Sequence, residues 1–455
     1  MDNVKENKLG TMPVRRLVFS MAGPLMISML TQALYNIIDS IYVSRIGEAA
    51  LTATSLSGPL QMLMVSCAVG TGVGVNSLVS RRLGEKKFDQ ANSGAMHGYM
   101  LCAILWIIFF AFGMTSVPWF FSKFTQDTVI RQFGTDYLSV CTRFCFGLMV
   151  AIVSERLLQS SGRASLSMTA QICGAVTNII LDPIMIFGLL GFPAMGIRGA
   201  AVATVIGQHV EAVIAVLFNL IKNKDIELSI KKFVFSLRTI KDIYAVGLPS
   251  ILMSAIGTVS NLLMNGVLMR FSSTAVAVLG VYFKLDSFIF MPTFGLTQGL
   301  VAIVGYNYGA KKKARIDEAV KTAMVVAVAI MATGTLVFQL IPDKLMGIFN
   351  AEGELLRMGI LAIREISPTY VIAVIAIVLG SMCTGVGDDM PTLVPNLVRQ
   401  AFIMVPVCWL LAKYVGMDWV WFTFIIGDIV ADIICIPMAA KVYRTKIKNL
   451  TEENA

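Results

Sequence analysis

The stretches GTGVGVNSLVSRRLGEKK, residues 70–87, and GLTQGLVAIVGYNYGAKK, residues 295–312, occupy equivalent places in the two halves of this 455-residue chain. A shift of 225 positions aligns three glycines and a pair of lysines between them without a gap. Chance matches between apolar sequences would be mostly leucine and valine, whereas matched glycines and loop lysines indicate a repeated structural unit. The chain is therefore predicted to contain an internal duplication.

The same shift holds for residues far outside these two stretches. It pairs Pro24 with Pro249, Asn36 with Asn261, Arg45 with Arg270 and Gly162 with Gly387. We expect two similar lobes, residues 1–221 and 243–455, joined by a basic linker over 222–242. The glycines at 70, 74, 295 and 299 have a simpler interpretation, because their spacing is also typical of close helix packing. Packing alone does not explain why prolines and lysines repeat as well.

Hydropathy predicts that both halves lie in a membrane. Hydrophobic residues make up 56% of the chain, charged residues only 14%, and the mean hydropathy is +0.75. Apolar stretches of about 20 residues, the length that crosses a bilayer as a helix, recur twelve times, centred near residues 30, 65, 104, 146, 179, 205, 252, 290, 325, 374, 403 and 426. The predicted fold is an all-α membrane protein of twelve transmembrane helices, in two six-helix lobes related by pseudo-two-fold symmetry as parallel repeats.

The distribution of Lys and Arg predicts the orientation. In the twelve-helix arrangement, 25 of them fall on the side of the two termini and 8 on the other side. By the positive-inside rule both termini and the linker are expected in the cytoplasm, in a multi-pass protein of the cell membrane surrounded by lipid. The net charge of +9 does not predict nucleic-acid binding, because the basic residues are spread over loops rather than gathered in one patch.

The residues that usually carry enzyme chemistry are scarce. His97 and His209 are the two histidines of the chain, and no H-E-x-x-H or G-x-S-x-G pattern occurs. The eight cysteines sit in apolar segments without a C-x-x-C pair, so they are expected to pack as small apolar residues. We therefore predict neither an enzyme nor a His-rich metal site.

Two carboxylates of the first half fall inside apolar segments, where a charge is costly and is a functional candidate by default. Asp39 lies deep in the first segment, with Tyr35 one helical turn before it and Asn36 beside that face. Asn178 and Asp182 are four positions apart in TNIILDP, residues 177–183, so their oxygens project from one helix face.

Pro183 follows this pair and lacks an N–H, which leaves the carbonyl of Ile179 without its helical partner. A carboxylate, an amide oxygen and a freed carbonyl are the hard ligands that a small cation prefers. A hydrogen-bonded cluster that only packs helices together is the alternative interpretation.

These residues resemble the multidrug and toxic compound extrusion (MATE) family. The resemblance spans essentially the whole chain and rests on the double six-helix repeat, the segment Gly23–Gly47, RRLGE at 81–85, the Asn-x-x-x-Asp-Pro at 178–183 and GAAVAT at 199–204. It implies export of organic cations and other amphipathic drugs in exchange for sodium or protons. It also implies an amino-lobe cation site formed by Asp39, Asn178, Asp182, Thr204 and Tyr137, of which the first four would hold sodium if sodium is the coupling ion.

No other cofactor is implied, and we expect the protein to act as a monomer on small amphipathic or cationic organic substrates. Tyr35, Asn36 and Asp286 are the candidate substrate contacts. For Asp286 an ion pair with a basic residue such as Arg364 is the equal alternative. Glu365, Asp428 and Asp432 receive no role, because their depth in the membrane does not follow from the sequence.

The second half departs from one pattern of the family. Some members carry a glutamate in helix 7, whereas the segment Leu248–Leu268 contains no acid, and the 225 shift places Met264 opposite Asp39. Coupling is therefore expected through the first half.

The alternative function is a flippase for lipid-linked saccharides from the same superfamily. A flippase should line its cavity with cations, but the four basic residues within the spans are scattered over four helices: Arg143, Lys284, Arg364 and Arg399. A channel fits less well, because one asymmetric carboxylate site in a duplicated chain is typical of alternating access.

Overall fold

The computed structural model of the protein describes residues 7–349 and 351–450. These residues form helices and turns with no strand between them. Eleven of the helices are long and apolar enough to cross a membrane, and the bent pair α6–α7 brings the number to 12 when it is counted as one span. The predicted all-helical membrane fold is confirmed. Lys5 and the two ends of the chain, on which the orientation also rests, lie outside the described residues.

The helices of the first half are α1 (Lys8–Thr11), α2 (Val14–Ser44), α3 (Glu48–Gly84), α4 (Phe88–Thr115), α5 (Val117–Phe124), α6 (Thr128–Arg143), α7 (Phe146–Ser160), α8 (Ala164–Phe187) and α9 (Ile197–Ile221), with the short turns η1 (Leu189–Gly191) and η2 (Ile230–Lys232). Those of the second half are α10 (Leu237–Met269), α11 (Ser273–Gly309), α12 (Lys313–Leu340), α13 (Pro342–Gly347), α14 (Gly353–Ile366), α15 (Tyr370–Gly385), α16 (Met390–Leu397), α17 (Val405–Tyr414) and α18 (Phe422–Val442), with η3 (Ser367–Thr369), η4 (Val398–Met404), η5 (Met417–Trp419) and η6 (Tyr443–Ile447).

The duplication is visible in the helix boundaries. Helices α3 and α11 have 37 residues each and begin and end 225 positions apart, and α4 and α12, with 28 residues each, do the same. The turn before each of the latter helices contains a lysine with φ of 57°, Lys86 in one half and Lys311 in the other. Equivalent sequence therefore forms equivalent backbone, including an unfavourable left-handed residue.

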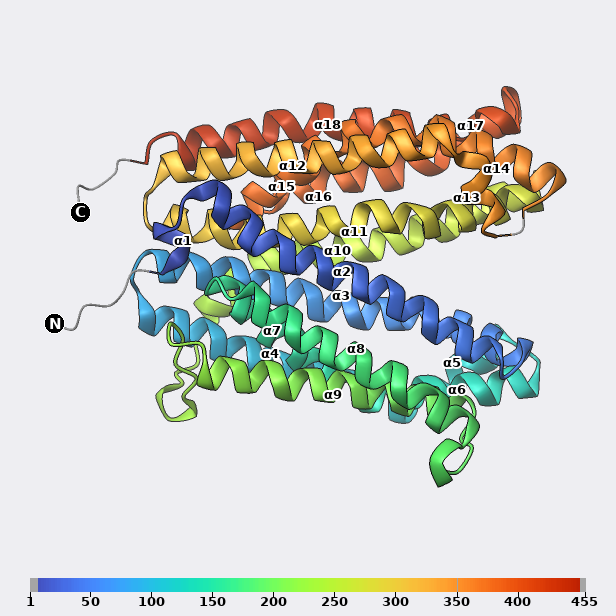
Figure 1. Cartoon of the computed structure of the whole chain (residues 1–455), viewed down its shortest axis with the longest axis horizontal. Helices are drawn as coiled ribbons and strands as arrows, with labels where there is room; N and C mark the ends of the chain where they lie inside the picture. Colours follow the sequence, from blue (N-terminus) through green and yellow to red (C-terminus); the bar gives the residue numbers. More distant parts are fainter. Residues whose placement is uncertain (1–6, 350, 451–455) are drawn as a thin grey trace. The chain divides into compact units, whose positions relative to one another are not determined.

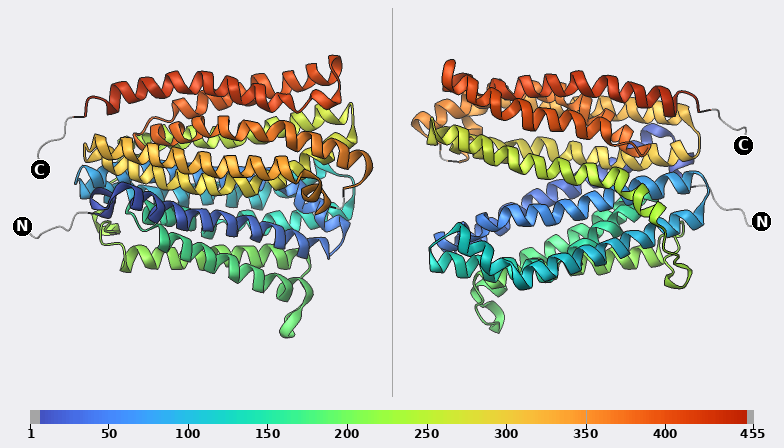
Figure 2. Two further views of the ribbon diagram at one scale, coloured as in Figure 1. Left: turned by 45° about the horizontal axis from the view of Figure 1, so that its top comes forward. Right: turned by 180° about the vertical axis from the view of Figure 1, so that it is seen from behind.

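The helices pack into two compact units. Unit 1 comprises Met1–Thr11 and Ile27–Ile251, and unit 2 comprises Met12–Met26 and Leu252–Ala455, so the long helices α2 and α10 are each divided between the units. In unit 1, α7, α8 and α9 pack against one another and α3 packs against α4 and α7 (Figures 1 and 2). In unit 2, α11 packs against α12 and α15, and α15 against α18. The lobe boundaries predicted from the repeat stay a prediction.

The repeated glycines are positions of close helix approach. In unit 1 a Cβ on Gly70 would lie 2.7 Å from the carbonyl oxygen of Gly247, and one on Gly74 would collide with the carbonyl oxygen of Ile243. In unit 2 a Cβ on Gly295 would lie 2.6 Å from the backbone nitrogen of Met26. The packing interpretation of these glycines therefore holds within each unit.

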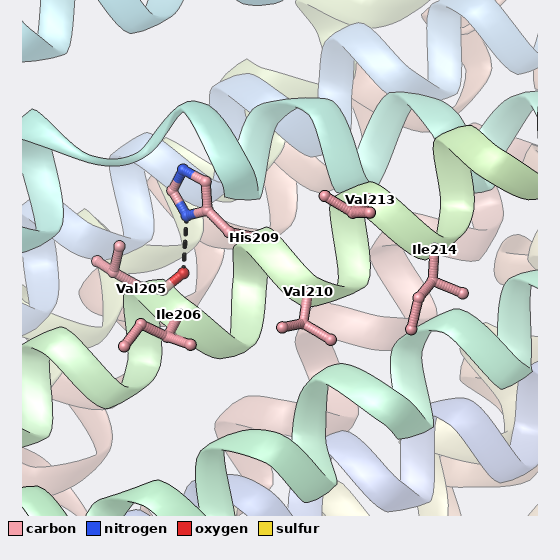
Figure 3. A pocket seen from close by; sticks show the side chains of 6 residues that line it. All are labelled: Val205, Ile206, His209, Val210, Val213 and Ile214. Atoms are coloured by element: carbon pink, nitrogen blue, oxygen red, sulfur yellow. Dashed lines mark hydrogen bonds between the residues drawn. The ribbon is translucent and has the colours of Figure 1, made fainter.

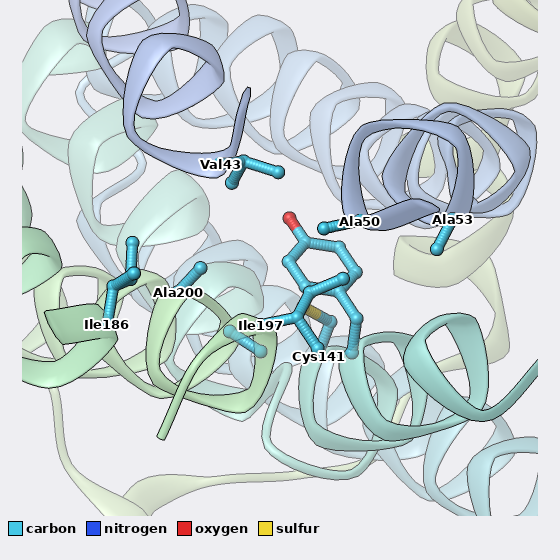
Figure 4. Packing of buried hydrophobic residues seen from close by; sticks show 9 residues of the cluster. Val43, Ala50, Ala53, Cys141, Ile186, Ile197 and Ala200 are labelled. Atoms are coloured by element: carbon cyan, nitrogen blue, oxygen red, sulfur yellow. The ribbon is translucent and has the colours of Figure 1, made fainter. Parts of the chain in front are cut away.

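A cluster of small and branched side chains joins several helix ends of unit 1. Figure 4 shows Val43 of α2, Ala50 and Ala53 of α3, Cys141 of α6, and Ile186, Ile197 and Ala200 of α8 and α9. The alanines on α3 and α9 have short side chains, so the backbones of these helices can come close to the helices packed against them. Tyr137 belongs to the same cluster, which fixes the position of its ring.

Several spans depart from a regular α-helix, two of them near residues of interest. The span formed by α6 and α7 bends by 46° between Arg143 and Phe146. In unit 2, the π-helical segment η4 separates α16 from α17, and the carbonyl of Gln400 within it accepts a hydrogen bond of 3.0 Å from the Ser260 hydroxyl of α10. The eight cysteines are all free, and six of them are buried, in agreement with the packing role predicted for them.

Candidate functional site

The residues predicted to bind a cation lie on four helices of unit 1. Asp39 is on α2, Tyr137 on α6, Asn178 and Asp182 on α8, and Thr204 on α9. Their side chains meet inside the unit. Asp182, Asn178, Tyr137 and Thr204 are buried, with exposed fractions of 0%, 1%, 5% and 7%. Asp39 is half-buried.

Asn178 connects α8 to α9. Its Nδ2 donates to Asp182 Oδ1 and to Thr204 Oγ1, both at 3.3 Å. The helices can come this close because α9 has a glycine there: a Cβ on Gly207 would lie 3.0 Å from the Asn178 Cβ and 2.9 Å from the Gly174 carbonyl oxygen. With both amide hydrogens used, the Asn178 Oδ1 remains as an acceptor directed away from these partners.

The carboxyl groups of Asp39 and Asp182 are neighbours within hydrogen-bonding range. Ionised carboxylates accept hydrogen bonds but donate none, so two of them cannot satisfy each other. Asp39 Oδ1, Asp182 Oδ2 and Asn178 Oδ1 are accordingly buried and without a hydrogen bond from any described residue. Three unsatisfied oxygens from three side chains form a site that a proton or a small cation would complete.

Two tyrosines complete the surroundings of the carboxyl groups. The Tyr35 side chain is a neighbour of Thr204, and both Tyr35 and Tyr137 lie close to Asp39. Gln61 of α3 donates to the Tyr137 hydroxyl at 3.4 Å. The sequence interpretation did not include Gln61, although a glutamine inside an apolar helix was a signal available for it.

Fixed positive charge is lacking around this cluster. Asp39 and Asp182 form no ion pair with any Lys or Arg of the described residues, and the groups that act on their carboxyls are each other and Asn178. Within the same part of the chain, no three His, Cys, Asp or Glu side chains gather as a metal-binding group. The candidate ligands are therefore two carboxylates, an amide oxygen and hydroxyl groups, which suits an exchangeable monovalent cation better than a tightly held transition metal.

Asn36 lies apart from this cluster. Its side chain is exposed, and its backbone carbonyl accepts from the Ser40 hydroxyl at 2.8 Å within α2. Its assignment as a substrate contact remains a prediction.

Asp286, the third candidate substrate contact, lies on α11 in unit 2. The Tyr282 hydroxyl donates to Asp286 Oδ1 at 3.1 Å, and the Tyr370 hydroxyl donates to that of Tyr282 at 3.1 Å. The alternative of an ion pair with a basic residue stays a prediction, but Arg364 of α14 is exposed, and the arginine that acts on Asp286 is Arg399. Sequence spacing could not show which helix faces α11.

The acids of unit 2 that received no role lie at different depths. Asp428 of α18 is 7% exposed, and its Oδ1 lies 2.6 Å from Arg399 Nε in the π-helical segment η4. Asp432, one turn further along α18, is 6% exposed and its Oδ1 accepts no hydrogen bond from a described residue. Glu365 of α14 is half-buried.

The expectation of two carboxylates within the first-half spans is wrong. Glu155 of α7 and Glu211 of α9 also lie inside apolar helices, and Glu155 is 8% exposed. Arg156, counted from the sequence among the basic residues of a loop, is 6% exposed within α7. Hydropathy alone did not show that these residues are buried inside the unit.

The pocket in Figure 3 is a groove of about 450 Å³ along α9. Its lining residues are Val205, Ile206, His209, Val210, Val213 and Ile214, and the His209 Nδ1 is bonded to the Val205 carbonyl at 2.8 Å. The side chains that line this groove include no oxygen ligand, unlike those of the cluster predicted to bind a cation.

Comparison with known proteins also indicates that the chain contains two similar halves. The MatE family model matches residues 24–184 and again residues 249–410. Two matches in one chain agree with the duplication, and their starting points are the repeated prolines Pro24 and Pro249.

Curated relatives share about a fifth of their residues with this chain over nearly its full length. The FAD transporter of Shewanella oneidensis is 23% identical over 434 residues, which cover 94% of this chain and 95% of that protein. The multidrug export protein MepA of Staphylococcus saprophyticus is 23% identical over 89% of each chain. The probable multidrug resistance protein NorM of Thermotoga maritima is 22% identical over 88% of this chain and 86% of its own length.

Solved structures show the same fold. A transporter of the MOP superfamily from Pyrococcus furiosus is 24% identical, covers 99% of this chain and 100% of its own, and has a TM-score of 0.92. A multidrug resistance MATE family transporter of that superfamily, in an outward-facing conformation, gives the same values.

Proposed function

Because this chain belongs to the MatE family, we propose that it is a multidrug efflux transporter, which exports amphipathic and often cationic compounds in exchange for sodium or protons. Transport proceeds by alternating access of the two lobes, and the Asp39–Asp182 cluster of unit 1 binds the coupling ion. The similarity to MepA and NorM supports the class of substrate, and the eleven to twelve apolar helices place the protein in a membrane.

The observation that carries the coupling site is the set of three buried, unsatisfied oxygens in unit 1. Asp39 Oδ1, Asp182 Oδ2 and Asn178 Oδ1 have no hydrogen-bond donor among the described residues, and no fixed cation compensates the two carboxyls. Leaving buried acceptors and charges unpaired is costly. An ion from solution offsets this cost in one conformation and is lost in another, as a coupling ion must be.

Coupling requires that the ion bind one state of the transporter more tightly than the other. The cluster provides such a difference, because its ligands come from α2, α8 and α9, and a small displacement of one helix changes the coordination. Pro183 lies inside α8 directly after Asp182 and removes one helical hydrogen bond. Bending of α8 at this point would move Asn178 relative to Asp182.

The flippase alternative has less support. Of the four basic residues that the sequence predicted within the spans, Arg143 donates to the Gly113 carbonyl at 3.3 Å, Arg399 pairs with Asp428, and Arg364 is exposed. The ammonium of Lys284 lies 5.8 Å from the ring centre of Phe349. These four cations have different partners and are not described as converging on one another, so they give no support to a pyrophosphate site.

The proposed orientation places both termini and the linker in the cytoplasm, and the transporter acts as a monomer. No cofactor takes part in the proposed cycle apart from the coupling ion. Tyr35 and Asn36 on α2, together with Asp286 on α11, are proposed to contact the transported compound.

The test uses purified protein in proteoliposomes loaded with a fluorescent cationic dye, with sodium and proton gradients imposed separately. We expect Asp39→Asn and Asp182→Asn each to slow gradient-driven export roughly 5- to 150-fold, the usual size of a coupling between two ligands. Dye binding to the same proteins in detergent should remain, because the amide keeps the shape of the carboxylate.

Asp432→Asn is the matched control, since it also removes a buried carboxylate but lies on α18 of unit 2. It should export dye at a rate near that of the wild type. Export by both unit 1 variants at near wild-type rates under either gradient would refute the proposed coupling site. The gradient that drives export identifies the coupling ion.

A further inference from the structure

A second pair of carboxyl groups lies inside unit 1, apart from the proposed coupling site. Helices α7 and α9 pack against each other, and the side chains of Glu155 on α7 and Glu211 on α9 are neighbours that act on each other. Glu155 is buried, and its Oε1 accepts no hydrogen bond from any described residue. Glu211 is half-buried. The proposed coupling cycle makes no use of either residue.

The position of Glu211 is fixed by a glycine contact between helices. A Cβ on Gly174 of α8 would lie 2.7 Å from the Glu211 Cβ and 3.0 Å from its Oε2. Only glycine at 174 therefore leaves room for this carboxyl group between α8 and α9. Asn178 is one turn from Gly174 on α8, and Thr204 is two turns from Glu211 on α9, so the pair lies about 10 Å from the coupling cluster along the helix axis.

The charges around the pair favour one bound proton. Two ionised carboxylates in contact would repel each other, and neither has a hydrogen to donate. The neighbouring cation is Arg156, whose Nη1 donates to Gln159 Oε1 at 2.9 Å. Two carboxyl groups, one guanidinium and one shared proton give a net charge of zero, whereas the same cluster without the proton has a net negative charge inside an apolar unit.

The helices packed against the pair bring no further charge to it. From α4, the Tyr99 hydroxyl is bonded to Ser154 Oγ at 2.8 Å, and from α8, Ser167 accepts from Gln159. From α3, Gly72 packs on the aliphatic part of Arg156. His209, on α9 itself, is bonded to the Val205 carbonyl. The ionisable groups that act on the pair are thus each other and Arg156.

We propose that Glu155 and Glu211 form a second proton-binding site of unit 1, which holds one proton between the two carboxyl groups. The site lies toward the ends of α8 and α9 that carry Arg163 and Lys222, the ends assigned to the cytoplasm. There it exchanges its proton with the cytoplasm and makes export depend on cytoplasmic pH. Proton binding itself does not depend on the proposed function, whereas the effect on export does.

The binding test uses infrared spectroscopy of the purified full-length protein, with glutamate labelled selectively with ¹³C so that the carboxyl bands of Asp39 and Asp182 are separated from those of glutamate. We expect a protonated glutamic-acid band at neutral pH that disappears in Glu155→Gln and in Glu211→Gln. A glutamine can donate to the remaining carboxylate, so these variants should fold. The band should persist in the Asp39→Asn/Asp182→Asn variant.

Glu365→Gln is the matched control, because it removes another half-buried glutamate from an apolar helix and should leave the band of the pair in place. Titration with base should release one proton more per molecule from the wild type than from Glu155→Gln/Glu211→Gln. A band that survives in that double variant, or equal proton release from the two proteins, would overturn the proposal.

The transport test separates this site from the coupling site. In proteoliposomes driven by one fixed gradient, the glutamine variants should still export dye, but the rate should change less with internal pH than in the wild type. The Asp39→Asn and Asp182→Asn proteins should export dye more slowly than the wild type by a similar factor at every pH. Unchanged pH dependence in the glutamine variants would refute the role in export and leave the proposed coupling site untouched.

Discussion

The two units place buried acids in opposite electrostatic environments. In unit 1, Asp39 and Asp182 face each other without a fixed cation. In unit 2, Asp428 pairs with Arg399 at 2.6 Å and Asp286 accepts from Tyr282. An acid that has a permanent partner gains little from an ion in solution, whereas an acid pair without one requires such an ion. The contrast holds for these two pairs of acids and not for every buried acid, since Asp432 of unit 2 also has an Oδ1 without a hydrogen bond from a described residue.

The two units differ in these contacts although their helices α3 and α11 have equivalent backbones. Position 61 of α3 and position 286 of α11 are equivalent under the 225 shift, and each is hydrogen-bonded to a tyrosine hydroxyl, Gln61 to Tyr137 and Asp286 to Tyr282. The partners are not equivalent, because position 282 corresponds to Ser57. Each unit therefore keeps a polar contact at this helix position but forms it with a different residue.

The strongest test of this difference between the two units is to remove one charge from each of them. Arg399→Gln should destabilise the protein by about 3–5 kcal/mol, because it leaves Asp428 buried without its cation. Asp182→Asn should leave the free energy of unfolding unchanged or raise it, because it removes repulsion between two carboxylates. Thermal unfolding in detergent, with and without sodium, measures both.

The double variant Arg399→Gln/Asp428→Asn is the control for this prediction. It should recover most of the stability lost in Arg399→Gln, since no buried charge is left without a partner. If Arg399→Gln and Asp182→Asn destabilise the protein equally, the two units do not differ in the way described.

Equivalent glycines of the two repeats provide a second, smaller test. A Cβ on Gly74 would collide with the backbone carbonyl of Ile243, whereas one on Gly299 would lie 3.3 Å from the Met21 Cβ, a side-chain atom. Gly74→Ala should therefore cost about 1–3 kcal/mol as an overpacking substitution, and Gly299→Ala clearly less. Expression level and unfolding temperature compare the two, and a reversed order would contradict the packing described for the repeats.

The smallest expected effect concerns Asp286. Its hydrogen bond from Tyr282 implies that Asp286→Asn costs about 1 kcal/mol of stability. If the residue acts only within this network, export of cationic and neutral dyes should fall by the same modest factor. A loss confined to cationic dyes would show that Asp286 contacts the substrate, in addition to its hydrogen bond from Tyr282.

The sequence by itself determined the duplication and the helical membrane fold, and it predicted the residues of the proposed coupling cluster. Glycines, prolines and loop lysines repeat at one shift because each constrains the backbone directly, and Asn178 and Asp182 share a helix face because of helical periodicity. Local rules of this kind require no knowledge of neighbouring helices.

The tertiary structure decided everything that depends on which helix lies opposite. It brought Asp39 of α2 beside Asp182 of α8 and paired Asp428 with Arg399 of η4. It also placed the Tyr282 hydroxyl on Asp286, with Tyr370 behind it. It also brought Glu155 and Glu211 together from α7 and α9. Side-chain contacts between helices depend on the angle at which two helices cross and on how each helix is rotated about its axis. The ridges, grooves and glycines on the helix surfaces determine both, but only once the helices are packed together.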